Sequence, residues 1–121
     1  MTLRDALRSE LTAALRRRDR PVASALRTAL AAIANAEAAP GVDTIDSRAG
    51  SAHIAGATAG LGATEVARLT LTEDEQRALV TQDQAELTSH AERLASLCRL
   101  DEADGARRAA RALGEALASS A

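Results

Sequence analysis

The chain contains no Phe, Tyr or Trp among its 121 residues, and this restricts the kind of core that it can build. Its bulky apolar side chains are 16 Leu, 4 Val and 3 Ile, whereas alanine occurs 31 times. Alanine has the highest helix propensity and buries no polar group. Its small side chain also lets neighbouring helices approach closely. The composition therefore predicts an all-α protein with a thin core.

A thin core leaves little free energy to offset the ordering of the chain. Burying a Leu, Ile or Val side chain contributes roughly 1.5–3 kcal/mol, while ordering the backbone of one residue costs about 1–2 kcal/mol. With so few bulky side chains the two sums nearly cancel. We therefore expect a marginally stable monomer that buries further surface either by self-association into a homo-oligomer or by docking onto a partner. A melting temperature independent of concentration would contradict this.

Capping residues divide the first third of the chain into two helices. Thr2 can cap a helix that carries leucines at steps of four and ends in three arginines. Asp19 followed by Pro21 is a typical stop-and-restart signal, because proline fits the first turn of a helix. The second helix is expected over residues 20–38, before Pro40. So short a connection predicts an antiparallel hairpin. The leucines of the first helix are Leu3, Leu7, Leu11 and Leu15.

The last third predicts a second hairpin. Thr72 and Glu75 form a capping box that opens a third helix, and Leu100–Glu102 reads as the cap of a fourth helix that runs to about residue 118 and frays after Leu117. Residues 39–63 hold five of the seven glycines and show no sustained period, which predicts a long flexible loop. The apolar positions of the third helix are Leu79, Val80, Leu87, Ala91, Leu94 and Cys98.

We thus expect one all-α domain over residues 1–121, with about four helices in two antiparallel hairpins joined by a Gly-rich loop. Two further glycines, Gly105 and Gly114, should weaken the fourth helix by about 1 kcal/mol each relative to alanine. A single cysteine excludes an internal disulfide and suits a reducing compartment. No apolar run reaches membrane-spanning length and no signal-peptide core begins the chain, so we expect a cytoplasmic protein.

Three segments stand out as a set: Arg16–Asp19, Leu26–Arg27 with Ala32–Glu37, and Gly60–Val66 leading into Leu71–Glu73. Together they resemble the GatB/YqeY domain family, in particular its YqeY-like proteins, over most of residues 1–100. The resemblance implies an all-helical domain related to the tail of the B subunit of the tRNA-dependent amidotransferase. That enzyme converts misacylated Glu-tRNA(Gln) or Asp-tRNA(Asn) with glutamine as amide donor.

In that enzyme the tail is thought to help hold tRNA, while catalysis lies in other domains and subunits. Stand-alone family members carry a carbon–nitrogen ligase label by this analogy. Longer members continue into a second helical subdomain, which we expect a chain ending at Ala121 to lack. The resemblance therefore implies a non-catalytic accessory module that binds tRNA or a protein of the aminoacyl-tRNA pathway. The alternative is a helical scaffold for protein–protein contact or self-association, without a link to tRNA.

Two groups of polar residues are candidate sites. Four arginines, Arg16, Arg17, Arg18 and Arg20, are suited to phosphate contacts, since arginine contacts with the phosphate backbone dominate nucleic-acid affinity. Their alternative role is to cap a helix and keep the surface soluble. The absence of aromatic side chains excludes recognition of bases by stacking. The second group, Arg27, Asn35 and Glu37, lies in the family-like segment and is a candidate polar groove; its alternative role is to satisfy helix-end groups and pair with a nearby acid.

Reactive side chains are few, and we expect no catalytic residue, metal or cofactor. His90 and Cys98 lie about 12 Å apart along one predicted helix, too far to share a metal or a proton, and nothing in the spacing draws His53 to either. The acids Glu73, Asp74 and Glu75 suit the positive end of a helix dipole. The glycines of the loop lack the Lys-Ser or Lys-Thr of a nucleotide-binding loop, so an independent amidotransferase is disfavoured. These glycines are Gly56, Gly60 and Gly62.

Overall fold

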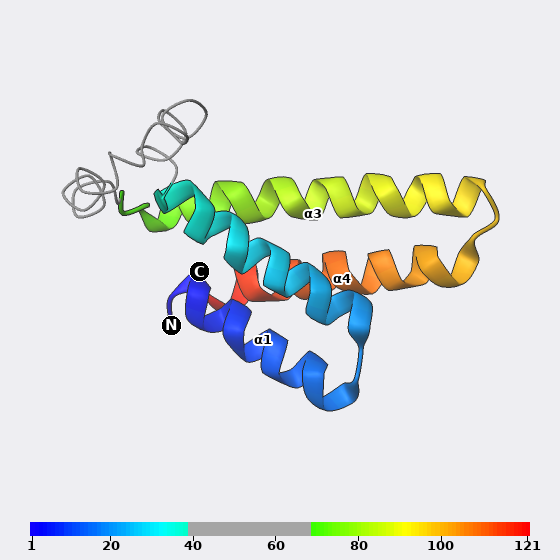
Figure 1. Ribbon diagram of the computed structural model, residues 1–121, viewed down its shortest axis with the longest axis horizontal. Coiled ribbons are helices and arrows are strands. Elements are labelled where there is room, and N and C mark those ends of the chain that lie inside the picture. Colours follow the sequence, from blue (N-terminus) through cyan, green and yellow to red (C-terminus); the bar gives the residue numbers. More distant parts are fainter. Residues whose placement is uncertain (39–68) are drawn as a thin grey trace, which may run out of the picture. The chain divides into compact units, whose positions relative to one another are not determined.

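The computed structural model describes residues 1–38 and 69–121, and these residues form four helices and no strand. The helices are α1 (Leu3–Arg17), a second helix over residues 20–38, α3 (Glu73–Ser96) and α4 (Leu100–Ser119) (Figure 1). The predicted all-α class is thus confirmed, while the predicted loop over residues 39–63 lies outside the described residues. The chain divides into two compact units, residues 1–32 with 72–121 and residues 33–71.

The first unit contains the whole of the second predicted hairpin and, of the first, α1 with the second helix up to Ala32. α3 and α4 lie antiparallel and pack along their lengths, and α1 makes its larger contact with α4 and a smaller one with α3 (Figure 1). The predicted caps hold α1 and α3 in place. Thr2 Oγ1 accepts the Asp5 N–H at 3.1 Å, and Thr72 and Glu75 form the reciprocal capping box. In addition, Glu73 accepts the free Leu3 N–H at 3.2 Å, so it joins the first turns of α1 and α3.

Each hairpin turns through a residue in the left-handed region that is not glycine. Arg18 has φ 61° and Cys98 has φ 62°. In both turns the N–H of the following residue bonds the carbonyl five positions back, which is the Schellman ending of a helix. These bonds are Asp19 N–H to Ala14 O and Arg99 N–H to Leu94 O, both 2.9 Å long. Glycine usually occupies the left-handed position because a Cβ there is strained.

The stripe of leucines on α1 is buried only in part. Leu3 and Leu7 are fully buried, but Leu11 is half-buried and Leu15 is 48% exposed. A step of four residues overshoots one helical turn by about 40°, so three steps rotate the side chain by about 120° away from the core. The core position is taken instead by Ala14, which is fully buried.

The core is made largely of alanine, as the composition predicts. Leu113 is the fully buried leucine of α4, and the rest of its buried face is small: Ala103, Gly105, Ala106, Ala109, Ala110, Ala112 and Ala116. Nearer the α3–α4 turn, a separate cluster joins Ala91 and Leu94 to the first turns of α4. Of the other apolar positions expected on α3, Val80 is buried, Leu79 and Leu87 are half-buried, and Cys98 is exposed because the helix ends at Ser96.

The expected fourth helix is present and ends one residue beyond the expected position, but the expected cap is wrong. α4 begins at Leu100 without a side-chain cap, and Glu102 instead pairs with Arg99 at 2.8 Å. At the other end the helix continues past Leu117 to Ser119. Arg77 stabilises this end of the helix, because its guanidinium donates a 2.9 Å hydrogen bond to the hydroxyl of Ser120, the residue after the helix.

The expected cost of the two glycines in α4 stays a prediction, but both glycines lie at close approaches. A Cβ on Gly105 would lie 3.0 Å from Cγ and 3.2 Å from Cβ of Pro21. A Cβ on Gly114 would lie 2.6 Å from Nε2 of Gln84, which donates to the Ala110 carbonyl at 3.1 Å. Glycine therefore gives the neighbouring side chains room at these two positions.

We predict that Gly105→Ala lowers the free energy of unfolding by up to about 2 kcal/mol, measured by urea denaturation. Overpacking costs about 1–3 kcal/mol and outweighs a gain in helix propensity of about 1 kcal/mol, since the Pro21 ring is fixed to the backbone. Gly114→Ala is the control, with a smaller loss expected because the flexible end of Gln84 can move. A stabilised Gly105→Ala variant would show that the approach to Pro21 is not tight.

We predict that Cys98→Gly raises the free energy of unfolding by up to about 1 kcal/mol, because it relieves the left-handed strain at the α3–α4 turn. Cys98→Ala keeps a Cβ at that position and should bring no gain. Thermal unfolding under reducing conditions measures both variants. Equal stability of the glycine and alanine variants would contradict the strain argument.

Candidate functional site

The candidate site is the arginine turn, which we define as residues 16–20. Arg16 and Arg17 form the last turn of α1, Arg18 turns the chain, and Arg20 begins the second helix. All four side chains are exposed, whereas Asp19 between them is only 14% exposed. The structure therefore brings the four arginines predicted as phosphate contacts to one end of the first hairpin.

Asp19 fixes this turn to α4. Its two carboxylate oxygens accept hydrogen bonds from Nε and Nη2 of Arg108 at 3.0 and 3.2 Å, in a bidentate pair across 89 positions of sequence. Asp19 also caps the second helix, since it accepts the Val22 N–H. The hydrogen bond from Arg108, which acts against the effect of burial, lowers the pKa of Asp19 below its ordinary value. The acid of the turn is thus neutralised from within the protein.

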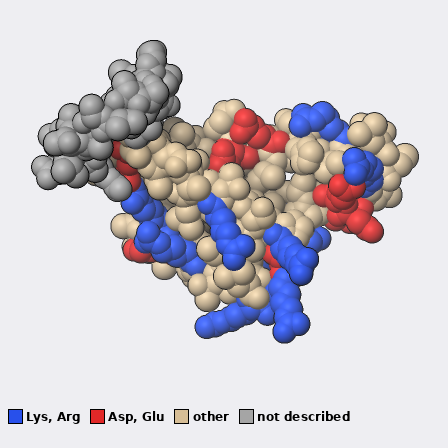
Figure 2. Space-filling model, viewed as in Figure 1, with Lys and Arg blue, Asp and Glu red and all other residues tan. Residues whose placement is uncertain are grey.

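Two hollows flank the arginine turn within the first unit. One, of about 470 Å³, is lined by Arg18, Arg20 and Arg27. The other, of about 230 Å³, is lined by Arg17 and by Arg108 and Arg111 of α4, together with the acids Glu10 and Glu115. On the face drawn in Figure 2, basic side chains gather over α1 and the second helix, while acidic side chains form one patch over α3 and another over the start of α4.

Sequence reasoning missed Arg108 and Arg111. Both stand in a run of alanines and arginines with nothing local to mark them. Their contribution depends on which face of α4 meets the first hairpin, which is a tertiary property. One signal was present in the sequence. Gly105 and Arg108 are three residues apart, so they lie on the same face of the predicted helix.

The second predicted group is divided between the two units. Arg27 is exposed at the first hollow, whereas Asn35 is exposed and Glu37 half-buried in the second unit. Glu37 binds the segment that precedes α3: its carboxylate accepts the Leu71 N–H at 3.1 Å and its carbonyl accepts the Leu69 N–H at 2.8 Å. The Glu37 side chain thus joins the end of the second helix to the segment before α3, and both roles expected of this group stay predictions.

The side chains suited to nucleophilic or metal chemistry do not gather in the described residues. Cys98 is exposed in the α3–α4 turn and His90 is exposed on α3. His53 and the three loop glycines fall in the part that the structure does not describe. Within residues 1–38 and 69–121, no three His, Cys, Asp or Glu side chains lie close enough together to hold a metal ion.

Comparison with known proteins adds no relative. No protein-family model matches the chain, and no curated protein or solved structure is significantly similar to it. The resemblance to the GatB/YqeY family therefore stays a prediction. Among the described helices, none combines the length and the apolar character needed to cross a bilayer.

We predict that the Asp19–Arg108 pair makes stability depend on acid pH. Because the folded pKa of Asp19 is lowered, its contribution is complete above about pH 4 and is lost as the pH falls through the folded pKa. In Arg108→Gln this loss should be smaller, so the free energy of unfolding should fall less steeply at acid pH. The raised pKa of Asp83 has the opposite effect, because it makes the free energy of unfolding rise as the pH falls. This effect is the same in both proteins.

Urea denaturation at a series of pH values from about 2 to 7 measures the effect. Arg107→Gln is the matched control, because Arg107 pairs at 3.2 Å with Asp104 on its own helix and does not contact the turn. If the free energy of unfolding falls equally steeply at acid pH in the wild type and in Arg108→Gln, the assignment of this pair is contradicted.

Proposed function

We propose that the protein is a non-catalytic accessory module that binds tRNA through its phosphate backbone, with the arginine turn as the contact surface. The observation that supports the proposal is the positive charge exposed at this turn. Four arginines are exposed within five residues, and Arg108 pairs the one acid among them. Because Asp19 is occupied by Arg108, the exposed guanidinium groups remain available to an anionic partner.

The proposed contact reads shape and phosphate rather than base sequence. The chain has no aromatic side chain to stack on a base. Arginine guanidinium groups instead bind phosphates, often with two parallel hydrogen bonds. Arg27 extends the surface by two turns along the second helix. Such binding releases counterions and weakens steeply as salt rises.

The choice of tRNA as the nucleic acid rests on the resemblance of residues 16–19 and 26–37 to the GatB/YqeY family. By the same resemblance, the partner is a tRNA of the amidotransferase pathway, and the module assists an enzyme rather than transferring the amide itself. A second candidate function is the helical scaffold. One observation favours it: Leu97 and Leu100 are 66% and 59% exposed on either side of the α3–α4 turn, where a second protein could cover them.

Fluorescence anisotropy with labelled tRNA at several salt concentrations tests the proposal. We expect binding by the wild-type protein, and a loss of at least about tenfold in affinity for the triple variant Arg16→Gln, Arg17→Gln and Arg18→Gln. The slope of log K against log salt should become shallower by about one for each phosphate contact removed.

A triple variant with Arg8→Gln, Arg93→Gln and Arg99→Gln is the control. It removes the same charge from exposed positions outside the arginine turn, so its affinity should change little. Equal losses in both variants would show that net charge, rather than this surface, determines binding. If the protein sediments as a dimer and does not bind tRNA, the proposal is refuted in favour of the scaffold.

A further inference from the structure

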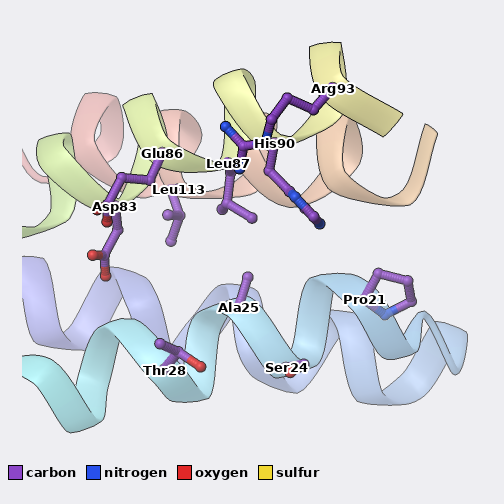
Figure 3. Close-up of a pocket in the computed structure, with 10 residues that line it drawn as sticks. All are labelled: Pro21, Ser24, Ala25, Thr28, Asp83, Glu86, Leu87, His90, Arg93 and Leu113. Carbon is purple, nitrogen blue, oxygen red and sulfur yellow. The ribbon is translucent and has the colours of Figure 1, made fainter. Parts of the chain in front are cut away.

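A groove between the second helix and α3, within the first unit, is separate from the arginine turn. Its volume is about 490 Å³, which falls in the range of small-molecule sites. Ser24 and Thr28 line it from the second helix, and a row of charged side chains lines it from α3 (Figure 3). Polar or charged side chains therefore contribute to both walls of the groove.

One end of the groove is acidic. Asp83 and Glu86 lie one helical turn apart on α3, and Figure 3 shows their carboxyl groups close together at this end. One carboxylate oxygen of Asp83, Oδ2, is shielded from solvent and receives no hydrogen bond from the described residues. Burial, followed by the charge of Glu86, raises the pKa of Asp83. A cationic group bound at this end of the groove would relieve the repulsion between the two acids.

The other end of the groove is basic. Arg93 lies seven residues beyond Glu86, about 10 Å along the helix axis, and His90 stands between them. The floor between the two ends is apolar, formed by Leu87 of α3 and the fully buried Leu113 of α4. The groove therefore presents negative charge, an apolar surface and positive charge in that order.

We propose that this groove binds a small amphoteric molecule with an ammonium group at one end and a carboxylate at the other, joined by an unbranched aliphatic chain. The ammonium group pairs with Asp83 and Glu86, the carboxylate pairs with Arg93, and the aliphatic chain lies over Leu87. This order of charges selects against simpler ligands. A diamine would place its second charge beside Arg93, and a dicarboxylate would place one beside Asp83. The inference does not depend on tRNA binding.

Isothermal titration calorimetry with three probes of matched length tests the proposal: 6-aminohexanoate, hexylamine and hexanoate. We expect 6-aminohexanoate to bind at least about tenfold more tightly than either compound with a single charged group. Asp83→Asn and Arg93→Gln should each weaken its binding by at least about tenfold. Glu92→Gln, which removes an exposed acid from the same helix outside the groove, should leave the affinity unchanged.

Loss of binding in Asp83→Asn is attributed to the groove only if the variant stays folded. Its melting temperature should equal or exceed that of the wild type, because a partly buried charge is removed. No binding of 6-aminohexanoate at millimolar concentration would overturn the proposal. Equal binding of the three probes, or unchanged binding in Arg93→Gln, would also overturn it. The triple variant of Arg16, Arg17 and Arg18 should retain the ligand, so this test fails or succeeds independently of tRNA binding.

Discussion

The docking of the first hairpin turn onto α4 determines how the first unit is organised. Arg108 binds both oxygens of Asp19, and Gly105, one helical turn earlier, leaves room for the ring of Pro21. The two contacts are complementary, since one fixes the turn by charge and the other allows it to approach. Because the same carboxylate caps the second helix, the start of that helix, the end of α1 and the middle of α4 are held at one point. The arginine turn is presented to solvent by this point of attachment.

A core of alanine has a second consequence, which is seen in the surface. Alanine fills the interior where helices meet closely, but it cannot fill the wider gaps where helices diverge. The gaps between the second helix and its neighbours are instead lined by charged side chains, arginines at one end of that helix and the α3 row along it. A chain with aromatic residues could close such gaps with large side chains. The same lack of large apolar side chains thus produces both the close packing of the helices and the open grooves between them.

Local signals predicted most of the fold, whereas the sites depend on tertiary contacts. The caps at Thr2 and Thr72 and the restart at Asp19 act over three or four residues, so the sequence alone identifies them. The face that each helix buries is harder to predict, as Leu15 and Ala14 show, because a small shift in register exchanges an exposed leucine for a buried alanine. Arg108 and the groove around Asp83 involve residues from elements far apart in the chain, and no local pattern marks them. The four exposed arginines were identified because they are consecutive or nearly so.

The bonds from Glu37 to the backbone of Leu69 and Leu71 bring two points of the chain, more than thirty positions apart, to hydrogen-bond distance. A change at one residue therefore acts far along the sequence. Loss of the Glu37 carboxylate would remove this acceptor of the Leu71 N–H, so a single side chain couples the end of the second helix to the segment before α3.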